Sequence, residues 1–203
     1  SVAARAEGSV ERYRRHPSPD WLDGNAVVHD VIGDPETTAQ IEPARFTRAL
    51  VDAAVANGAT YVTGIVDGIE REPGTGMVRG VSIDGEVHPA DVVVLALGPW
   101  TDRAARWLAL PQVVAMKSAS SVLADAEVID RRSCFRPVTV DGVPFIGPVD
   151  GAPGIFLAAG HASWGMLLAP ATGRMVAEMI VDGESSSVNA EPFSPSRLPA
   201  ARM

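Results

Sequence analysis

Residues 155–183 contain an apolar run, a glycine-rich turn and a helix whose order suits the binding of an electron-rich group. Ile155–Ala159 is typical of a buried strand. In Gly160–Gly165 the missing side chains let a flat ligand approach the backbone. We expect Pro170 in the first turn of the helix, where its missing N–H costs nothing, and Gly183 at the helix end. The N–H groups at the helix start would then face an electron-rich or anionic group. Spacing alone favours a simpler alternative, in which the glycines serve tight packing.

The residue types in two segments are more specific than their spacing. Residues 136–147 read Arg-Pro-Val-Thr-Val-Asp-Gly-Val-Pro-Phe-Ile-Gly, and residues 154–173 contain Gly-His, a further glycine and Ala-Pro-Ala-Thr-Gly. These segments resemble the C-terminal signature of the D-amino-acid oxidase-like FAD-dependent oxidoreductases, particularly the glycine oxidase and sarcosine oxidase branch. The resemblance implies an α/β FAD-binding fold of the glutathione-reductase type, with FAD as the cofactor.

The same resemblance implies a catalytic role for Arg136, which would hold the carboxylate of an amino-acid substrate. An arginine fork binds a carboxylate through two parallel hydrogen bonds. The alternative is a structural ion pair between Arg136 and Asp141. The sarcosine oxidase branch instead uses a lysine at a position that is Leu167 here, so the glycine oxidase-like role of Arg136 is favoured.

Other site residues follow from the resemblance as expected flavin contacts. His161 is expected under the ring, where a proton or hydrogen bond near the pyrimidine end would raise the electron affinity of the flavin; a loop histidine facing solvent is the alternative. Cys134, the single cysteine, is either an inert buried residue or, as in the sarcosine oxidase branch, the covalent attachment point of the flavin. The remaining expected contacts near the ring are Gly160, Gly165, Met166 and Leu167.

The middle of the chain is predicted to form a helix, a small antiparallel meander and a buried strand. Glu42-Pro43 opens the helix and Asn57-Gly58 closes it. Short β-prone runs joined by turns predict strands at residues 60–62, 66–71, 77–83 and 86–88. Asp91–Leu97 is a continuous apolar run, typical of a strand buried on both faces. Thr101 or Asp102 can then cap a helix that continues through Leu108. A surface helix is also predicted at residues 1–15.

This middle portion also resembles the family. Val93–Trp100 is similar to the strand and turn that close the dinucleotide-binding sheet. The resemblance implies that backbone near Val66 holds the adenine end of FAD and that Gly98-Pro99 packs by the phosphates or the ribityl chain. A plain turn at the end of a strand is the alternative for Gly98.

Two departures from the family pattern are expected to matter. No Gly-x-Gly-x-x-Gly motif for the FAD pyrophosphate occurs in the 203 residues, and relatives insert most of a substrate-binding sheet near residues 121–131. We therefore assign residues 1–110 to part of the FAD-binding domain, with the meander at 60–90. Residues 111–135 are a remnant of the substrate domain, 136–185 the C-terminal part of the FAD-binding domain, and 186–203 a tail. The chain is either part of a longer polypeptide or a truncated product.

The missing unit would leave two apolar strands uncovered. We expect the edge of Asp91–Leu97 and one face of Ile155–Ala159 to be covered by polypeptide outside this chain or by a partner subunit. Exposing such strands to water is costly, and an open edge invites pairing with another chain.

Composition narrows the class of protein. With 25 Asp and Glu against 17 Lys and Arg, the net charge of −8 argues against a nucleic-acid partner. One cysteine excludes an intrachain disulfide, and the four histidines form no cluster that predicts a metal site. No apolar run approaches the length of a membrane span, and the charged start resembles no signal peptide. A soluble, cytoplasmic protein is expected, either as a single chain or as a homo-oligomer.

These features together predict an FAD-dependent oxidase or dehydrogenase that acts on the CH–NH group of an amino acid or a secondary amine. Oxygen or another electron acceptor would reoxidise the flavin. The alternative is a truncated, non-catalytic remnant that serves as a binding or structural module without FAD.

Overall fold

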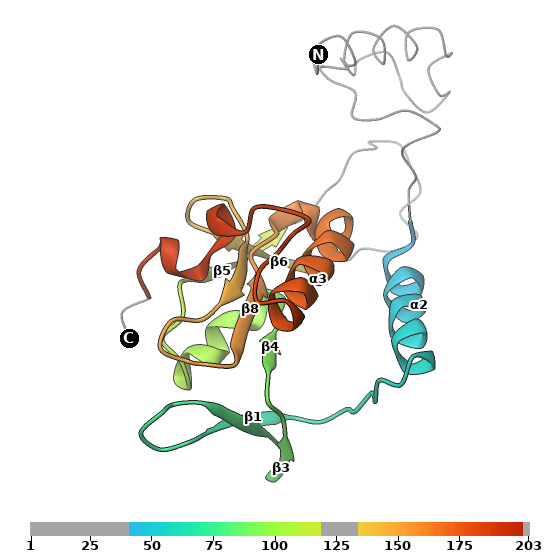
Figure 1. Ribbon diagram of the computed structural model, residues 1–203. Helices are drawn as coiled ribbons and strands as arrows, with labels where there is room; N and C mark the ends of the chain where they lie inside the picture. Colours follow the sequence, from blue (N-terminus) through green and yellow to red (C-terminus); the bar gives the residue numbers. More distant parts are fainter. Residues whose placement is uncertain (1–40, 119–133, 201–203) are drawn as a thin grey trace, which may run out of the picture. The chain divides into compact units, whose positions relative to one another are not determined.

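The computed structural model describes residues 41–118 and 134–200, which Figure 1 draws in colour. The chain divides into two compact units, residues 1–61 and residues 62–203. The helix predicted at residues 1–15 lies outside the described residues. Within the described ranges, no helix is both long enough and apolar enough to cross a membrane.

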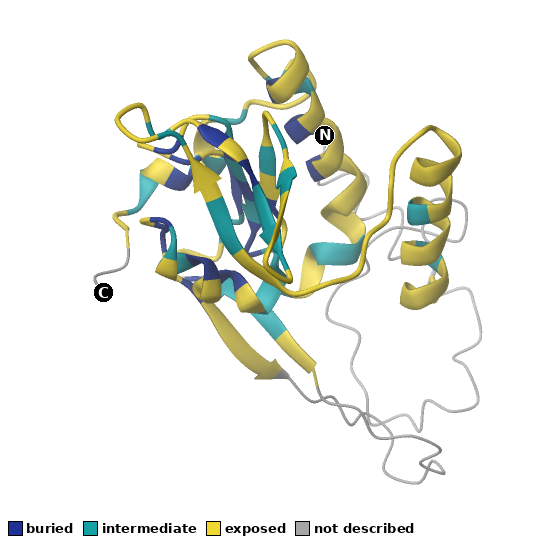
Figure 2. Cartoon of the chain, turned by 90° about the horizontal axis from the view of Figure 1, so that it is seen from below, coloured by how far each residue is buried: buried dark blue, intermediate teal, exposed yellow. Residues whose placement is uncertain are grey.

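The first unit contains one described helix, α2, which spans Pro43–Ala56 and confirms the predicted helix. Its start is capped by the carboxylate of Glu42, which accepts hydrogen bonds from the backbone N–H groups of Ala44 at 3.2 Å and Arg45 at 2.6 Å. Its residues are mostly exposed (Figure 2). The strand predicted at residues 60–62 is wrong: these residues are exposed and pair with no described strand.

The second unit begins with the predicted antiparallel meander. It consists of β1 (Val66–Arg71), β2 (Val78–Ile83) and β3 (Glu86–Pro89), paired in the order β1-β2-β3. The turn between β2 and β3 is Asp84-Gly85, with φ angles of 52° and 81°. Two consecutive positive φ angles match the twist of a tight hairpin, which explains why this dipeptide identified the turn.

A mixed sheet forms the centre of the second unit. Its strands are β4 (Val93–Leu95), β8 (Ile155–Ala159) and β7 (Phe145–Pro148), in the order β4-β8-β7. β4 is parallel to β8, and β7 is antiparallel to it. The bounds of β8 are those predicted. β4 is shorter than Asp91–Leu97 and is not buried on both faces, since Val94 is 40% exposed. The reason is that β4 pairs only with β8 among the described residues and lies at the sheet edge.

Both faces of β8 are covered, so the expectation of an open face is wrong. Leu157 lies in a core cluster with Ala104 from η1, a 3₁₀ helix at Gly98–Arg106. Phe156, on the opposite face, packs against a second cluster that contains Met175 of α3, the helix Gly165–Val181. Figure 2 shows the buried residues gathered in this sheet and on one side of α3. Packing on both faces therefore fixes β8, and with it the position of the turn that follows.

Two helix starts differ from the prediction. Thr101 does not cap a helix, because η1 has already begun at Gly98 and the Thr101 hydroxyl donates to the Gly98 carbonyl at 2.7 Å. α3 begins at Gly165, so Pro170 lies inside the helix and not in its first turn. Proline has no backbone N–H, so one hydrogen bond near the start of the helix is lost. Burial of the apolar face further along α3 offsets this cost. Gly183, with φ of 85°, follows the helix as predicted.

A two-stranded antiparallel sheet that the sequence did not predict carries the Cys134 segment. Its strands are β5 (Val113–Ser118) and β6 (Cys134–Thr139), with Met116 opposite Arg136. Three short 3₁₀ helices complete the described elements: η2 (Ala162–Trp164), η3 (Glu191–Phe193) and η4 (Pro195–Arg197).

The segment after α3 is fastened to the turn between β6 and β7 by one arginine. Arg197 donates from Nε to Oδ2 of Asp141 at 2.8 Å and from Nη2 to Oδ1 at 3.0 Å. Its guanidinium also lies 4.2 Å from the ring centre of Phe145. The hydrogen bonds from Arg197 hold the pKa of Asp141 well below its usual range, so the carboxylate stays ionised at neutral pH.

Candidate functional site

Two turns singled out from the sequence lie at one edge of the mixed sheet. β4 and β8 are parallel and in register, so their carboxyl ends reach the same edge. Gly98 follows β4, Gly160 follows β8, and their φ angles are 54° and 89°. In open α/β sheets, ligands bind beyond the carboxyl ends of the strands. The structure therefore brings Gly98 and Pro99 to the same edge as Gly160 and His161.

Gly160 is held in close contact with β6. A Cβ atom at this position would lie 2.4 Å from Cγ2 of Thr139, and the φ of 89° also disfavours any other residue. The turn is joined to the strand by a backbone bridge between His161 and Val138. Both conformation and space therefore require glycine here, and the turn is fixed relative to β6.

The start of α3 lies next to this turn and has no side-chain cap. Gly165, Met166 and Leu167 are its first three residues, and the residue before them, Trp164, makes no side-chain capping bond. N–H groups in the first turn of a helix have no partner within it and carry a partial positive charge. Leu167 is 70% exposed and Trp164 is 52% exposed, so large apolar surfaces flank these donors. The arrangement suits a flat, electron-rich ligand.

Arg136 reaches this turn from β6. It is half-buried, and its Nη1 donates to the hydroxyl of Ser163 in η2. The alternative partner proposed from sequence, Asp141, instead forms its ion pair with Arg197. An ion pair between Arg136 and Asp141 is therefore not the explanation for this arginine. Its guanidinium lies beside the glycine turn, where a carboxylate ligand could be bound.

His161 is half-buried and hydrogen-bonded, so it is not a loop histidine that faces solvent. Its Nε2 lies 2.9 Å from the hydroxyl oxygen of Thr172 in α3. Burial lowers the pKa of His161 below its ordinary value, because desolvation disfavours the imidazolium. The ring is therefore neutral at pH 7 and can exchange hydrogen bonds without carrying a fixed charge.

Cys134 and Val66 have different positions relative to the turn. Cys134 is an exposed free thiol, so the alternative of an inert buried cysteine is wrong. It lies two residues before Arg136 and on the same face of β6, since side chains alternate along a strand. Val66, by contrast, opens β1 in the meander, pairs with Ile83 and belongs to neither turn at the sheet edge.

Three residues near the candidate site were not found by sequence reasoning. Ser163 binds Arg136, Thr172 binds His161, and Arg197 binds Asp141 at the end of β6. Thr172 belongs to the Ala-Pro-Ala-Thr-Gly segment, so its position in a motif was the only available signal. Among the described residues, no group of three His, Cys, Asp or Glu side chains is placed to hold a metal ion.

Comparisons with known sequences agree with this geometry. The model of the family described as FAD dependent oxidoreductase matches residues 4–127 and 110–179. A glycine oxidase from Pseudomonas aeruginosa is 36% identical over 73 residues, which is 36% of this chain and 20% of that protein. A glycine oxidase from Geobacillus kaustophilus is 40% identical over 72 residues, 36% of this chain and 19% of that protein. The aligned part is thus about a fifth of each relative.

Solved structures show the same fold over a longer range. L-proline dehydrogenase from P. horikoshii has a TM-score of 0.64 at 18% identity and covers 76% of this chain and 59% of its own. Glycine oxidase from Geobacillus kaustophilus has a TM-score of 0.59 at 24% identity, with coverage of 75% and 57%. The described residues therefore form part of the FAD-binding fold of these proteins, which confirms the predicted fold class.

Proposed function

We propose, on the premise that the chain belongs to the FAD-dependent oxidoreductase family, that its protein oxidises the CH–NH group of an amino acid or a secondary amine. The observation that carries the proposal is the convergence of Gly160, the uncapped start of α3 and the guanidinium of Arg136 on one turn. Glycine oxidase relatives at 36% and 40% identity support an amine substrate.

The residues at the sheet edge fit a flat flavin ring. At Gly160 the room for a side chain is filled by Thr139 of β6, so this glycine serves tight packing, and the support for a ring comes from the start of α3, which has no side-chain cap. Gly160, His161, Gly165, Met166 and Leu167 would hold the ring, and Gly98 with Pro99 would lie by the phosphate or ribityl part. When bound, FAD supplies the two-electron acceptor that amino-acid side chains lack.

The substrate end of the proposal rests on Arg136 and His161. Arg136 binds the carboxylate of the substrate and thereby orients the carbon that carries the amine. Ser163 fixes one branch of the guanidinium and leaves the rest of the fork for the ligand. His161, kept neutral by burial and fixed by Thr172, provides a hydrogen bond beside the turn and no positive charge. Cys134 lies on the same face of β6, where covalent attachment of the flavin remains part of the proposal.

Reduction of the flavin by matched substrates tests the proposal. In the absence of oxygen, glycine, sarcosine or proline is expected to bleach the flavin absorbance, whereas glycolate, a hydroxy acid of similar size, is expected to leave it unchanged. The outcome differs because only the first group carries a CH–NH bond. A yellow preparation bleached equally by hydroxy acids would contradict the substrate class. A colourless preparation that ignores added FAD would instead favour the non-catalytic remnant.

A further inference from the structure

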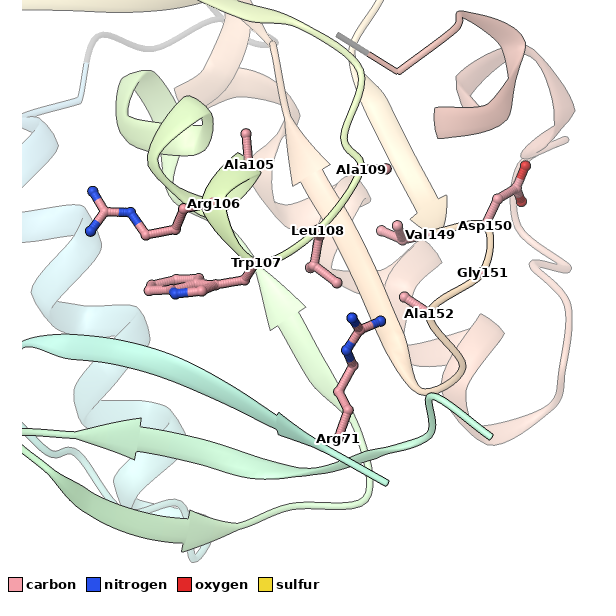
Figure 3. A pocket seen from close by; sticks show the side chains of 10 residues that line it. All are labelled: Arg71, Ala105, Arg106, Trp107, Leu108, Ala109, Val149, Asp150, Gly151 and Ala152. Atoms are coloured by element: carbon pink, nitrogen blue, oxygen red, sulfur yellow. The ribbon is translucent and has the colours of Figure 1, made fainter. Parts of the chain in front are cut away.

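A cavity lies at the opposite end of β8 from the glycine turn. Its volume is about 360 Å³, and it lies between the end of β1, the segment that ends η1 and the turn between β7 and β8 (Figure 3). That turn leads into the start of β8, whereas Gly160 follows its end. The five residues of β8 rise by about 3.3 Å each, so the cavity and the glycine turn are separate places. Small-molecule sites commonly have volumes of about 300–1,000 Å³.

The lining of this cavity combines an apolar floor with a cation. Leu108, Val149 and Ala152 are buried and belong to the main core cluster. Arg71 extends from the end of β1, and in Figure 3 its guanidinium points toward Leu108 and Ala152. Among the described residues, no carboxylate forms an ion pair with Arg71. The cation and the floor can therefore contact one ligand together.

Three further lining residues form one wall of the cavity and set its net charge. The guanidinium of Arg106 lies 5.7 Å from the ring centre of Trp107, so this arginine covers one face of the indole. Asp150 also lines the cavity, but its carboxylate points away from Arg71 in Figure 3. Two arginines and one aspartate give the lining a net charge of +1, which suits a ligand with one negative charge.

We propose that this cavity is a binding site for a small monocarboxylate with an aromatic body. The carboxylate pairs with Arg71, and the ring lies on the floor of Leu108, Val149 and Ala152 beside Trp107. The site holds its ligand independently of the proposed oxidation chemistry, because Arg136 and the glycine turn are at the other end of β8.

Titration with phenylacetate tests the site on the full 203-residue chain. The probe is expected to shift the NMR signal of the Trp107 indole N–H, assigned by its loss in Trp107→Phe, and the shift is expected to saturate. Phenylacetamide, which has the same shape without the charge, is expected to bind at least about tenfold more weakly. Arg71→Gln should weaken phenylacetate binding by a similar factor. Arg79→Gln is the matched control, since Arg79 is an exposed arginine of the same meander that is already paired with Glu72.

One further variant separates this site from the proposed substrate site. Arg136→Gln is expected to leave the phenylacetate affinity at Trp107 unchanged, whether or not the protein oxidises amines. Arg71 is exposed, so its replacement should preserve the fold, and an unchanged dispersion of the remaining NMR signals checks this. Equal binding of acid and amide, absence of a saturating shift at Trp107, or loss of binding in Arg136→Gln and not in Arg71→Gln would overturn the proposal.

Discussion

Replacing Gly160 by alanine is expected to lower the free energy of unfolding by about 2–6 kcal/mol. The φ of 89° is a conformation that alanine adopts only at a cost, and the new Cβ would lie 2.4 Å from Cγ2 of Thr139. The backbone bridge between His161 and Val138 prevents the turn from moving away freely. We therefore expect both a lower midpoint in urea denaturation and a weaker affinity for FAD, because the turn that would contact the ring is displaced.

Two further variants distinguish the clash from a general effect of substituting glycine. Gly173→Ala changes a glycine inside α3 that has no positive φ and where a Cβ atom would meet no other atom within 4 Å, and it is expected to stabilise the chain by about 0.5–1 kcal/mol. Thr139→Ser removes the clashing methyl group while keeping the hydroxyl that donates to Val143 at 2.8 Å. Combined with Gly160→Ala, it should restore part of the stability. If Gly160→Ala did not lower the free energy of unfolding relative to Gly173→Ala, the tight contact between Gly160 and Thr139 would be disproved.

Replacing Arg136 by alanine is expected to raise KM for an amino-acid substrate by a factor equivalent to about 2–5 kcal/mol. That range is the cost of leaving a buried carboxylate without its charged partner. Arg136 is half-buried beside the glycine turn, and within the described residues its ion-pair alternative, Asp141, is bound to Arg197. Steady-state kinetics with the carboxylate substrate and with a secondary amine lacking a carboxylate measure the effect.

The controls for Arg136 use both substrate and protein. The amine without a carboxylate should show little change in KM, because it makes no contact that the variant removes. Arg174→Ala removes an exposed arginine of α3 whose Nε pairs with Glu178 at 2.7 Å, and its KM should equal that of the native chain. An unchanged KM for the amino acid in Arg136→Ala would show that Arg136 serves only the structure.

The elements that the sequence predicted are those with a strong local signal. α2 has a capping glutamate followed by proline, the meander has an Asp-Gly turn, and β8 is a bounded apolar run. The bounds of β8 were clear because both of its faces are covered, which excludes polar residues from the whole run. Local propensity and burial therefore agree in these segments.

The elements that the sequence missed depend on distant partners. β5 and β6 form one sheet although residues 119–133 separate them in the chain, and neither strand has an alternation pattern strong enough to reveal the pairing. α3 begins before Pro170 although the buried residues of the helix all follow the proline, so burial does not account for its early start. For β5 and β6 tertiary packing decides the structure, and spacing along the chain carries little of that information.

The candidate site shows the same division. Motif resemblance identified Arg136, Gly160 and His161, but not the side chains that fix their orientation. Thr172 is eleven residues from His161, and Arg197 is 56 residues from Asp141. Such contacts follow from the folding of α3 and of the segment after it onto β6 and β7. Val66, which the resemblance places at the adenine end of FAD, opens β1 of the meander, and its role there stays a prediction.

A crystal structure of the protein with bound FAD tests the central claim most directly. We predict that the isoalloxazine ring lies in contact with residues 160–165, with the start of α3 directed at the ring and the guanidinium of Arg136 on the substrate side. This position follows from the helix start without a side-chain cap and from the guanidinium of Arg136, which is bound to Ser163 beside the turn. A flavin bound elsewhere in the chain, with residues 160–165 free of it, would contradict the account.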